Sequence, residues 1–439
     1  MSDPCDPNDV PSLPANATHA VRESHTPLRA GTHAATAASP LPPCRLKAVP
    51  PSSAAGENRP HHRFSLLLAG LALLFLHHLA PSHVPPHRAH LAHLAVLGAP
   101  DAVDDTKGVA PRTVSLIDHA RLRIDAALYE LSLPSIAVAL RQAADRGVHV
   151  RLFVESDNEK SPAERNCLSL LGSAVAIRGD NRPALMHNKF LVIDRQVVWT
   201  GSVNLSWTGC HLLYDEAILL FNREIAADYE EEFENLWNRL PDASSHRAIK
   251  IDGVLVGVAF KPGADRLRPF LEAVQHAHSR IEVAAFSLTH HAIVASLAQR
   301  AREGIPVDIV LDGRLARGPA GRRAVAALTR AGCILHFGAA RPGPDLCTRF
   351  GLPFSQDVKI HHKLLVADGC NIVTGSANLS ANGMEHNDEN VLWLNHAGTL
   401  ARTWENLLRR ARKTCVDDET VTDCEEDPTL HTQAREESR

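Results

Sequence analysis

Two stretches of the chain repeat one spacing of polar residues: MHNKFLVIDRQVVWTGSVNLS (186–206) and HHKLLVADGCNIVTGSANLS (361–380). Both contain the pattern HxKx4Dx6GSxN. Its fixed positions are His187, Lys189, Asp194, Gly201, Ser202 and Asn204 in the first stretch, and His361, Lys363, Asp368, Gly375, Ser376 and Asn378 in the second. Six specified positions at about 5% frequency each arise by chance about once in sixty million windows. Two occurrences therefore indicate one kind of chemical site built twice.

The motifs lie inside a longer internal repeat. Residues 123–155 match residues 280–312 without a gap, and the match places Tyr129 opposite Phe286. In each copy a β-branched strand leads into an amphipathic helix, a glycine ends the helix and a second strand follows, which is typical of a βαβ unit. FENLW (233–237) and WENLL (404–408) predict the helices that close the two copies. The fold class is therefore α/β, with two pseudo-symmetric α/β/α sandwich halves, residues 94–240 and 250–414.

Strand alternation places the motif side chains. Side chains two apart on a strand share a face, so His187 and Lys189 should point together, as should His361 and Lys363. His362 should point to the opposite face and is interpreted as structural. We expect Asp194 and Asp368 to lie at the turn after the strand and to hold backbone or the motif lysine, and Gly201 and Gly375 to be structural. The returning strand brings the GSxN residues back beside the histidine and lysine, so two halves would place eight polar groups around one point.

The paired motifs resemble those of the phospholipase D superfamily, over about 320 residues. The resemblance implies phospholipase D-like halves with one active site at their interface, built within a single chain, so that no oligomer is required. It also implies phosphodiester hydrolysis through a phosphohistidine, with no metal or cofactor. Lys189, Lys363, Asn204 and Asn378 would donate to the nonbridging oxygens, and Ser202 and Ser376 would bind substrate. By analogy, His187 is the nucleophile and His361 the acid, although the motifs alone do not distinguish them.

Family members also carry an acid that holds a catalytic imidazole. The candidates here are Glu216, 29 residues after His187, and Glu389, 28 residues after His361. Both lie inside apolar strands, which argues against exposure to solvent. We therefore expect these two carboxylates to fix the tautomer of the catalytic histidines and to stabilise their cationic form.

The distribution of charge bears on the substrate. The 439 residues carry a net charge of −4, but residues 415–439 alone hold two basic and nine acidic residues. Residues 64–414 hold 38 basic and 36 acidic residues and are almost neutral. Nucleic-acid binders usually show a strong basic footprint, so a phospholipid substrate is favoured over nucleic acid, unless a local basic patch reverses that preference. An endonuclease using the same site remains an alternative, as does a non-catalytic phosphate-binding scaffold.

The N-terminal region predicts a leader and an attachment segment. Residues 1–63 lack apolar periodicity and are expected to be disordered. They precede FSLLLAGLALLFL (64–76), and residues 64–80 resemble a signal or weak membrane anchor, which favours export or membrane anchoring, with a cytoplasmic protein as the alternative. Eight histidines between 61 and 93 have irregular spacing and no neighbouring carboxylate or cysteine, so we expect no metal site there. An insertion at 347–359, just before His361, is either a substrate-recognition loop or a tolerated surface insertion, and residues 415–439 form an acidic tail.

Overall fold

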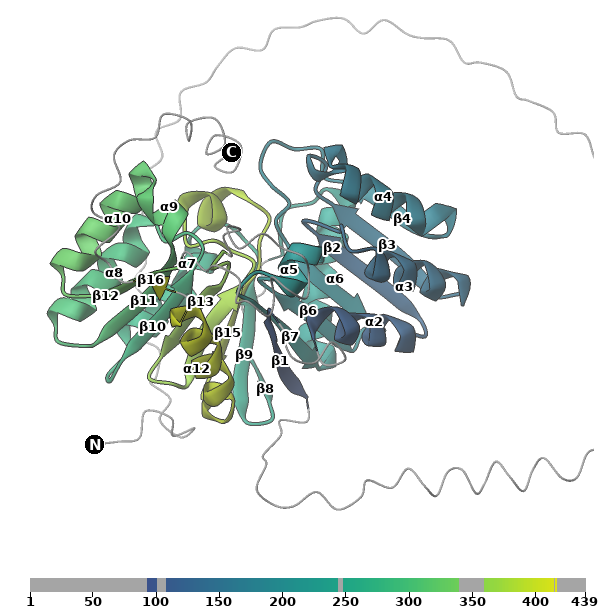
Figure 1. Cartoon of the computed structure of the whole chain (residues 1–439). Helices are drawn as coiled ribbons and strands as arrows, with labels where there is room; N and C mark the ends of the chain where they lie inside the picture. Colours follow the sequence, from purple (N-terminus) through teal and green to yellow (C-terminus); the bar gives the residue numbers. More distant parts are fainter. Residues whose placement is uncertain (1–92, 101–107, 244–247, 339–358, 414, 417–439) are drawn as a thin grey trace, which may run out of the picture. The chain divides into compact units, whose positions relative to one another are not determined.

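The computed structural model describes residues 93–100, 108–243, 248–338, 359–413 and 415–416. Within them, the first half forms a seven-stranded sheet of order β1-β7-β6-β5-β2-β3-β4 (Figure 1). Its strands are β1 (Leu94–Ala99), β2 (Arg123–Leu128), β3 (His149–Val154), β4 (Ala176–Gly179), β5 (Lys189–Ile193), β6 (Val197–Gly201) and β7 (Asp215–Phe221). Its α-helices are α2 (Val109–His119), α3 (Pro134–Asp145), α4 (Pro162–Leu171), α5 (Trp207–His211) and α6 (Arg223–Asn238).

The described residues of the second half form a nine-stranded sheet of order β16-β12-β11-β10-β13-β14-β15-β9-β8. Its strands are β8 (Ile249–Ile251), β9 (Val254–Ala259), β10 (Ile281–Ala285), β11 (Val307–Asp312), β12 (Ile334–Gly338), β13 (Lys363–Ala367), β14 (Asn371–Gly375), β15 (Val391–Asn395) and β16 (Cys415–Val416). Its helices are α7 (Ala264–Gln275), α8 (His291–Arg302), α9 (Gly313–Arg317), α10 (Pro319–Arg330), the π-helical turn η3 (Asn382–His386) and α12 (Gly398–Arg412). The predicted fold class is confirmed.

Strand pairing in the two sheets follows one pattern and brings each motif to the same place. In the first half β2 and β3 are parallel, and β5 lies antiparallel to β2 with Lys189 opposite Leu128. In the second half β10 and β11 are parallel, and β13 lies antiparallel to β10 with Lys363 opposite Ala285. Each motif lysine therefore begins a strand at the edge where a parallel strand ends. In α/β sheets, polar side chains at that edge commonly form a ligand site.

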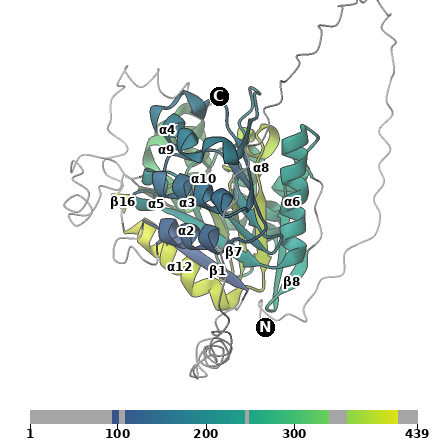
Figure 2. The same ribbon diagram turned by 90° about the vertical axis from the view of Figure 1, so that its right-hand side faces the viewer.

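The two halves share a buried core. Helices α2, α3 and α4 cover the outer face of the first sheet, toward the viewer in Figure 2, and α7, α8 and α10 cover the outer face of the second. A third cluster combines residues of both sheets with α6 and α12. In it the Tyr229 ring packs edge-on against Phe190 at 5.1 Å and against Phe260 of the second half at 5.0 Å. Each large side chain buried there contributes about 1.5–3 kcal/mol to stability, so the halves form one structural unit.

The motif aspartates hold backbone at the turns that follow β5 and β13. The Asp194 carboxylate accepts hydrogen bonds from the backbone N–H groups of residues 121, 122 and 123. Asp368 accepts from the N–H groups of residues 278, 279 and 280 and from the Ser279 hydroxyl. Burial would raise the pKa of Asp368, but these hydrogen bonds outweigh it and lower the pKa. Each turn is thereby tied to the segment that enters β2 or β10. Neither aspartate bonds the motif lysine, whose ammonium group has other partners.

Several predicted features lie outside the described residues. They are the leader 1–63, the apolar segment 64–80, almost all of the insertion 347–359 and the tail beyond residue 416. In the ranges that the structure does describe, no helix combines the length and apolar character needed to cross a bilayer. Membrane attachment through 64–80 therefore stays a prediction.

Candidate active site

The two motifs meet at the seam between the halves through backbone hydrogen bonds. Met186 forms an isolated bridge with Asp388, and the His187 N–H donates to the Asp388 carbonyl at 2.9 Å. Tyr214 bridges Ile360 in the same way, and the His361 N–H donates to the Tyr214 carbonyl at 2.9 Å. The strand start that carries each motif histidine is therefore held by the opposite half.

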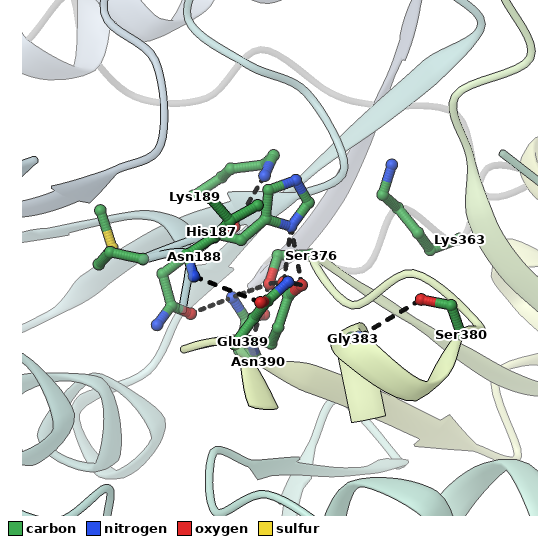
Figure 3. A network of polar contacts seen from close by, with 12 residues as sticks. His187, Asn188, Lys189, Lys363, Ser376, Ser380, Gly383, Glu389 and Asn390 are labelled. Atoms are coloured by element: carbon green, nitrogen blue, oxygen red, sulfur yellow. Dashed lines mark hydrogen bonds and ion pairs between the residues drawn. The ribbon is translucent and has the colours of Figure 1, made fainter. Parts of the chain in front are cut away.

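Each motif histidine is paired with a carboxylate from the other half. His187 Nδ1 lies 2.8 and 2.9 Å from the two carboxylate oxygens of Glu389 (Figure 3). His361 Nδ1 lies 3.0 and 2.9 Å from those of Asp215. The histidines are 5% and 7% exposed, and both acids are fully buried. Because Nδ1 is occupied by the acid, Nε2 is the ring nitrogen left to each imidazole for chemistry.

The acid predicted for the first half is wrong by one residue. Glu216 does not reach a motif histidine: its carboxylate bonds His362 Nδ1 and accepts from the Thr374 hydroxyl, and all three side chains are fully or almost fully buried. Neighbouring residues on a strand face opposite ways, so Asp215 points to the site and Glu216 away from it. The same alternation explains His362, which lies on the face away from the site, as predicted, and is fully buried there. The missed signal was the spacing: His187 and His361 are 174 residues apart, and the same offset pairs Asp215, not Glu216, with Glu389.

Behind the two imidazole–acid couples the halves differ. The residue equivalent to His362 is Asn188, and the residue equivalent to Glu216 is Asn390. The Asn390 amide donates to Asn188 Oδ1 at 3.0 Å, and its own oxygen accepts from Thr200 and Tyr229. Figure 3 shows Asn188 directed away from His187, toward Asn390. The layer behind His187 is therefore a neutral amide pair, whereas an imidazole–carboxylate pair lies behind His361.

Two lysines and two aromatic rings complete the surroundings of the imidazoles. Lys189 Nζ donates to the His187 carbonyl at 2.7 Å, and Lys363 Nζ donates to the His361 carbonyl at 2.7 Å and lies 3.2 Å from His361 Nε2. The Tyr129 ring packs edge-on against His187 with centroids 4.6 Å apart and lies 4.8 Å from Lys189 Nζ. Phe286 takes the same position in the second half: its ring centroid lies 4.9 Å from that of His361 and 5.3 Å from Lys363 Nζ. Sequence reasoning missed the role of these rings, although the repeat pairs them.

The motif asparagines present an unsatisfied amide. Among the described residues, the side-chain oxygens of both Asn204 and Asn378 are buried without a hydrogen-bond partner. Each asparagine is backed by a tightly packed glycine: a Cβ at Gly209 would lie 2.4 Å from the Asn204 carbonyl oxygen, and one at Gly383 would lie 2.2 Å from that of Asn378. These oxygens are acceptors and do not bind an anion, so it is the NH2 group of each asparagine that can donate to a phosphate bound between the halves.

The motif serines do not face substrate, so that prediction is wrong. Ser202 and Ser376 are fully buried. The Ser376 hydroxyl donates to Glu389 Oε2 at 2.6 Å, and that of Ser202 accepts from the backbone N–H of Glu216 at 3.1 Å. The serines thus position the strand that supplies the acids. The preceding glycines, at 201 and 375, have φ of 137° and 134°, and a Cβ at either would lie 2.3 Å from a backbone oxygen of that strand, so only glycine fits.

Burial sets the charge state of the site. Desolvation lowers the pKa of His187 to about 4 and that of His361 to about 3. The paired acids, Glu389 and Asp215, raise these pKa values, but by less than desolvation lowers them. Burial also lowers the pKa of Lys189 to about 7 and that of Lys363 to about 8. Burial would raise the pKa of the two acids, but the facing imidazoles and the lysines lower it. At neutral pH, without an anion, the imidazoles are neutral and the acids ionised. A bound diester would add a negative charge that favours protonation of an imidazole.

The low lysine pKa values predict an alkaline limit to activity. We expect kcat/KM to fall as pH rises through about 7 to 8, because Lys189 and then Lys363 lose the charge that attracts the phosphate. Hydrolysis of bis(p-nitrophenyl) phosphate followed across pH would isolate this effect, since its leaving group needs no proton from the enzyme. A level kcat/KM up to about pH 10, where ordinary lysines lose their charge, would contradict the prediction.

The polar groups at the seam are imidazole–acid couples and hydrogen-bond donors. In the described part of the chain, no group of three or more His, Cys, Asp or Glu side chains is arranged to hold a metal ion. The acids at the seam are engaged with imidazoles, and the remaining donors are ammonium and amide groups that suit an anion directly. Activity without a metal remains a prediction, to be tested with a chelator.

Two α/β halves that place facing histidine, lysine and asparagine sets at one seam define a two-motif phosphodiesterase-type protein. The family model described as "Cardiolipin synthase, PLD-like domain" matches residues 113–237 and 270–411, more than half of the chain. The chain therefore belongs to this family, within the phospholipase D superfamily. The two matched segments correspond to the two halves of the fold.

Individual relatives agree with this assignment. A "Mitochondrial cardiolipin hydrolase" of Xenopus tropicalis is 33% identical over 140 residues, 32% of this chain and 66% of the relative. A "Phospholipase D" of Rickettsia felis is 31% identical over 119 residues, 27% of this chain and 59% of the relative. The chain thus spans less than two thirds of the length of either relative. The crystal structure of phosphatidylserine synthase from Haemophilus influenzae matches 80% of this chain and 94% of its own with a TM-score of 0.58; at 13% identity it shows the fold alone.

Proposed function

We propose that the protein hydrolyses the head-group phosphodiester of a phospholipid to phosphatidic acid and an alcohol through a phosphohistidine. The observation that carries the proposal is the pair of imidazole–acid couples facing one another across the seam, with a lysine beside each. Such a couple fixes the tautomer of the imidazole and leaves Nε2 for the substrate. Two of them supply both a nucleophile and a proton donor, which are the two groups that a double displacement needs.

In the first step, neutral His187 attacks phosphorus with Nε2. The P–N bond forms while the bond from phosphorus to the head-group oxygen breaks, and protonated His361 gives its proton to that oxygen. Charge grows on the nonbridging oxygens as phosphorus becomes five-coordinate. Lys189 and Lys363 oppose that charge, and the amides of Asn204 and Asn378 donate to the same oxygens.

In the second step, water attacks the phosphohistidine. His361, now neutral, accepts a proton from the water as the new P–O bond forms and the P–N bond breaks, which restores His187. Phosphatidic acid then leaves. Every proton in the cycle passes through His361, so the ionised Asp215 behind it stabilises the imidazolium that forms in each turnover.

A phospholipid substrate is favoured by the near-neutral charge of residues 64–414 and by the names of the relatives. An endonuclease would use the same groups on a different diester and stays the alternative. For a non-catalytic scaffold there is no support in the site, because both motifs are complete and both imidazole–acid couples are formed.

An assay of the purified protein on vesicles and on single-stranded DNA tests the substrate. We expect phosphatidic acid to be released from vesicles containing phosphatidylcholine or cardiolipin, unaffected by a chelator, and no cleavage of DNA. A preparation of His361→Ala serves as the blank for contaminating activity. Cleavage of DNA that falls steeply with salt, without any release from lipid, would favour the endonuclease. Activity that a chelator abolishes would contradict the metal-independent scheme.

A further inference from the structure

A run of arginines lies on the second half. Residues 313–330, which form α9 and α10, contain five arginines and no aspartate or glutamate. All five arginines are exposed. We call them the arginine surface: Arg314, Arg317, Arg322, Arg323 and Arg330. The near-neutral total of the chain conceals this local concentration of positive charge.

The arginine surface begins beside the active site. Lys363 lies opposite Ala285, and Ala285 lies opposite Leu311 on the next strand, β11. The following residue, Asp312, caps α9 by accepting from the backbone N–H groups of residues 314 and 315, both at 3.2 Å. Neighbouring strands are about 4.8 Å apart, so α9 starts roughly 10 Å from the motif lysine. Figure 1 shows α9 and α10 next to each other in the second half.

Four of these five charges are not neutralised by the described protein. Within the described part of the chain, no ion pair involves Arg317, Arg322, Arg323 or Arg330. Arg280 and Arg412 of the same half, by contrast, are paired with carboxylates. Arg322 and Arg330 donate hydrogen bonds to backbone carbonyls, which leave the positive charge uncompensated. These four arginines are therefore available to an anionic partner.

The equivalent segment of the first half lacks this excess of positive charge. Residues 156–173 follow β3 as residues 313–330 follow β11, and they contain three acidic and two basic residues. Two of these, Asp157 and Lys160, pair with each other. Glu164, the third acidic residue, is buried, so the exposed charges of this segment balance. The pseudo-symmetry of the fold thus does not extend to charge: residues 313–330 carry an excess of positive charge that the equivalent segment lacks.

This one-sided charge fits a membrane better than a nucleic acid. A single strand that crossed the seam would meet no comparable positive charge in the equivalent segment of the first half, and residues 313–330 have no aromatic side chain on which bases could stack. A flat anionic surface needs positive charge on one side only. We infer that the arginine surface docks the protein on an anionic phospholipid membrane, beside the site that acts on the lipid. This inference rests on the proposed function for its choice of partner.

Charge removal with a matched control tests the docking. The variant Arg322→Gln/Arg323→Gln removes two charges from the arginine surface, and Arg112→Gln/Arg121→Gln removes two exposed charges from the first half. Each arginine near an anionic surface contributes roughly fivefold to binding, so the first variant should partition about 10- to 30-fold more weakly to phosphatidylcholine vesicles that contain phosphatidylglycerol. The control should bind like wild type, and binding by wild type should weaken with salt.

Activity on two substrates separates this inference from the proposed function. The variant of the arginine surface should hydrolyse bis(p-nitrophenyl) phosphate in solution at the wild-type rate and lose activity only on anionic vesicles. Equal vesicle binding by the two variants would overturn the docking inference, whatever the substrate. So would tighter binding to single-stranded DNA than to vesicles through the same two arginines. If no lipid is hydrolysed but the vesicle binding depends on these arginines, the proposed function fails and the docking surface stands.

Discussion

Replacing Asp215 with asparagine should lower kcat for phosphodiester hydrolysis by on the order of a thousandfold or more. Asp215 lies 2.9–3.0 Å from His361 Nδ1 and is fully buried. An asparagine amide has no charge to stabilise the imidazolium, and its NH2 group turned toward Nδ1 would favour the tautomer with the proton on Nε2. The chain would fold, and the proton transfers of both steps would slow. Steady-state hydrolysis of lipid vesicles measures the loss.

Glu216→Gln is the matched control, because it makes the same chemical change one residue further along β7. Glu216 bonds His362 and Thr374 and does not contact a motif histidine. We therefore expect kcat to stay close to that of wild type, with the effect appearing as a lower melting temperature from the disturbed buried pair. Equal losses of kcat in the two variants would contradict the assignment of Asp215. So would a Asp215→Asn protein with nearly full activity.

The sequence predicts the motif side chains well because their placement depends only on local rules. Alternation along β5 and β13 decides that His187 and Lys189 point together and that His362 points away. The aspartates at 194 and 368 follow from the turn that the motif implies. These features do not depend on what packs against the strand. The internal repeat and the alternation of side chains along a strand are therefore enough to predict them.

The acid beside His361 shows where local rules end. Asp215 and Glu216 are adjacent carboxylates in an apolar strand, and an error of one residue exchanges the face toward the site for the face away from it. Only the offset between the two copies distinguishes them. The serines at 202 and 376 were misassigned for a related reason: their hydroxyls face the strand that carries the acids, and this pairing becomes visible only when the sheet is assembled. Total charge likewise conceals the arginine surface, because it averages over both halves.

The exchange of acids across the seam also has a consequence for the repeat. Each half carries a complete motif, but the carboxylate that orients its histidine belongs to the other half. An isolated half would leave its imidazole without a counter-charge and its own acid without a partner. Neither copy is therefore a functional unit, although each carries the whole motif. In the single chain, Glu389 pairs with His187 and Asp215 pairs with His361.

With an activated substrate, the His361→Ala variant should form the phosphohistidine once and then stop. On lipid it should be inactive, by a factor of at least about 1,000, because the alcohol leaves without a proton. On bis(p-nitrophenyl) phosphate the leaving group needs no proton, so His187 should still displace it, and the intermediate should persist because no base activates the water. The expected result is a burst of about one p-nitrophenol per chain, with a phosphoryl adduct on His187 detected by mass spectrometry.

The His187→Ala variant supplies the contrast that assigns the nucleophile. It removes the same ring from the other half of the pseudo-symmetric site, so any difference between the variants reports on roles and not on the loss of an imidazole as such. We expect neither burst nor adduct, with melting behaviour like that of His361→Ala. A burst from His187→Ala with the adduct on His361 would reverse the assignment. Bursts from both variants would mean that the two histidines are interchangeable, and that the different layers behind them, Asn188 with Asn390 and His362 with Glu216, do not determine which one attacks.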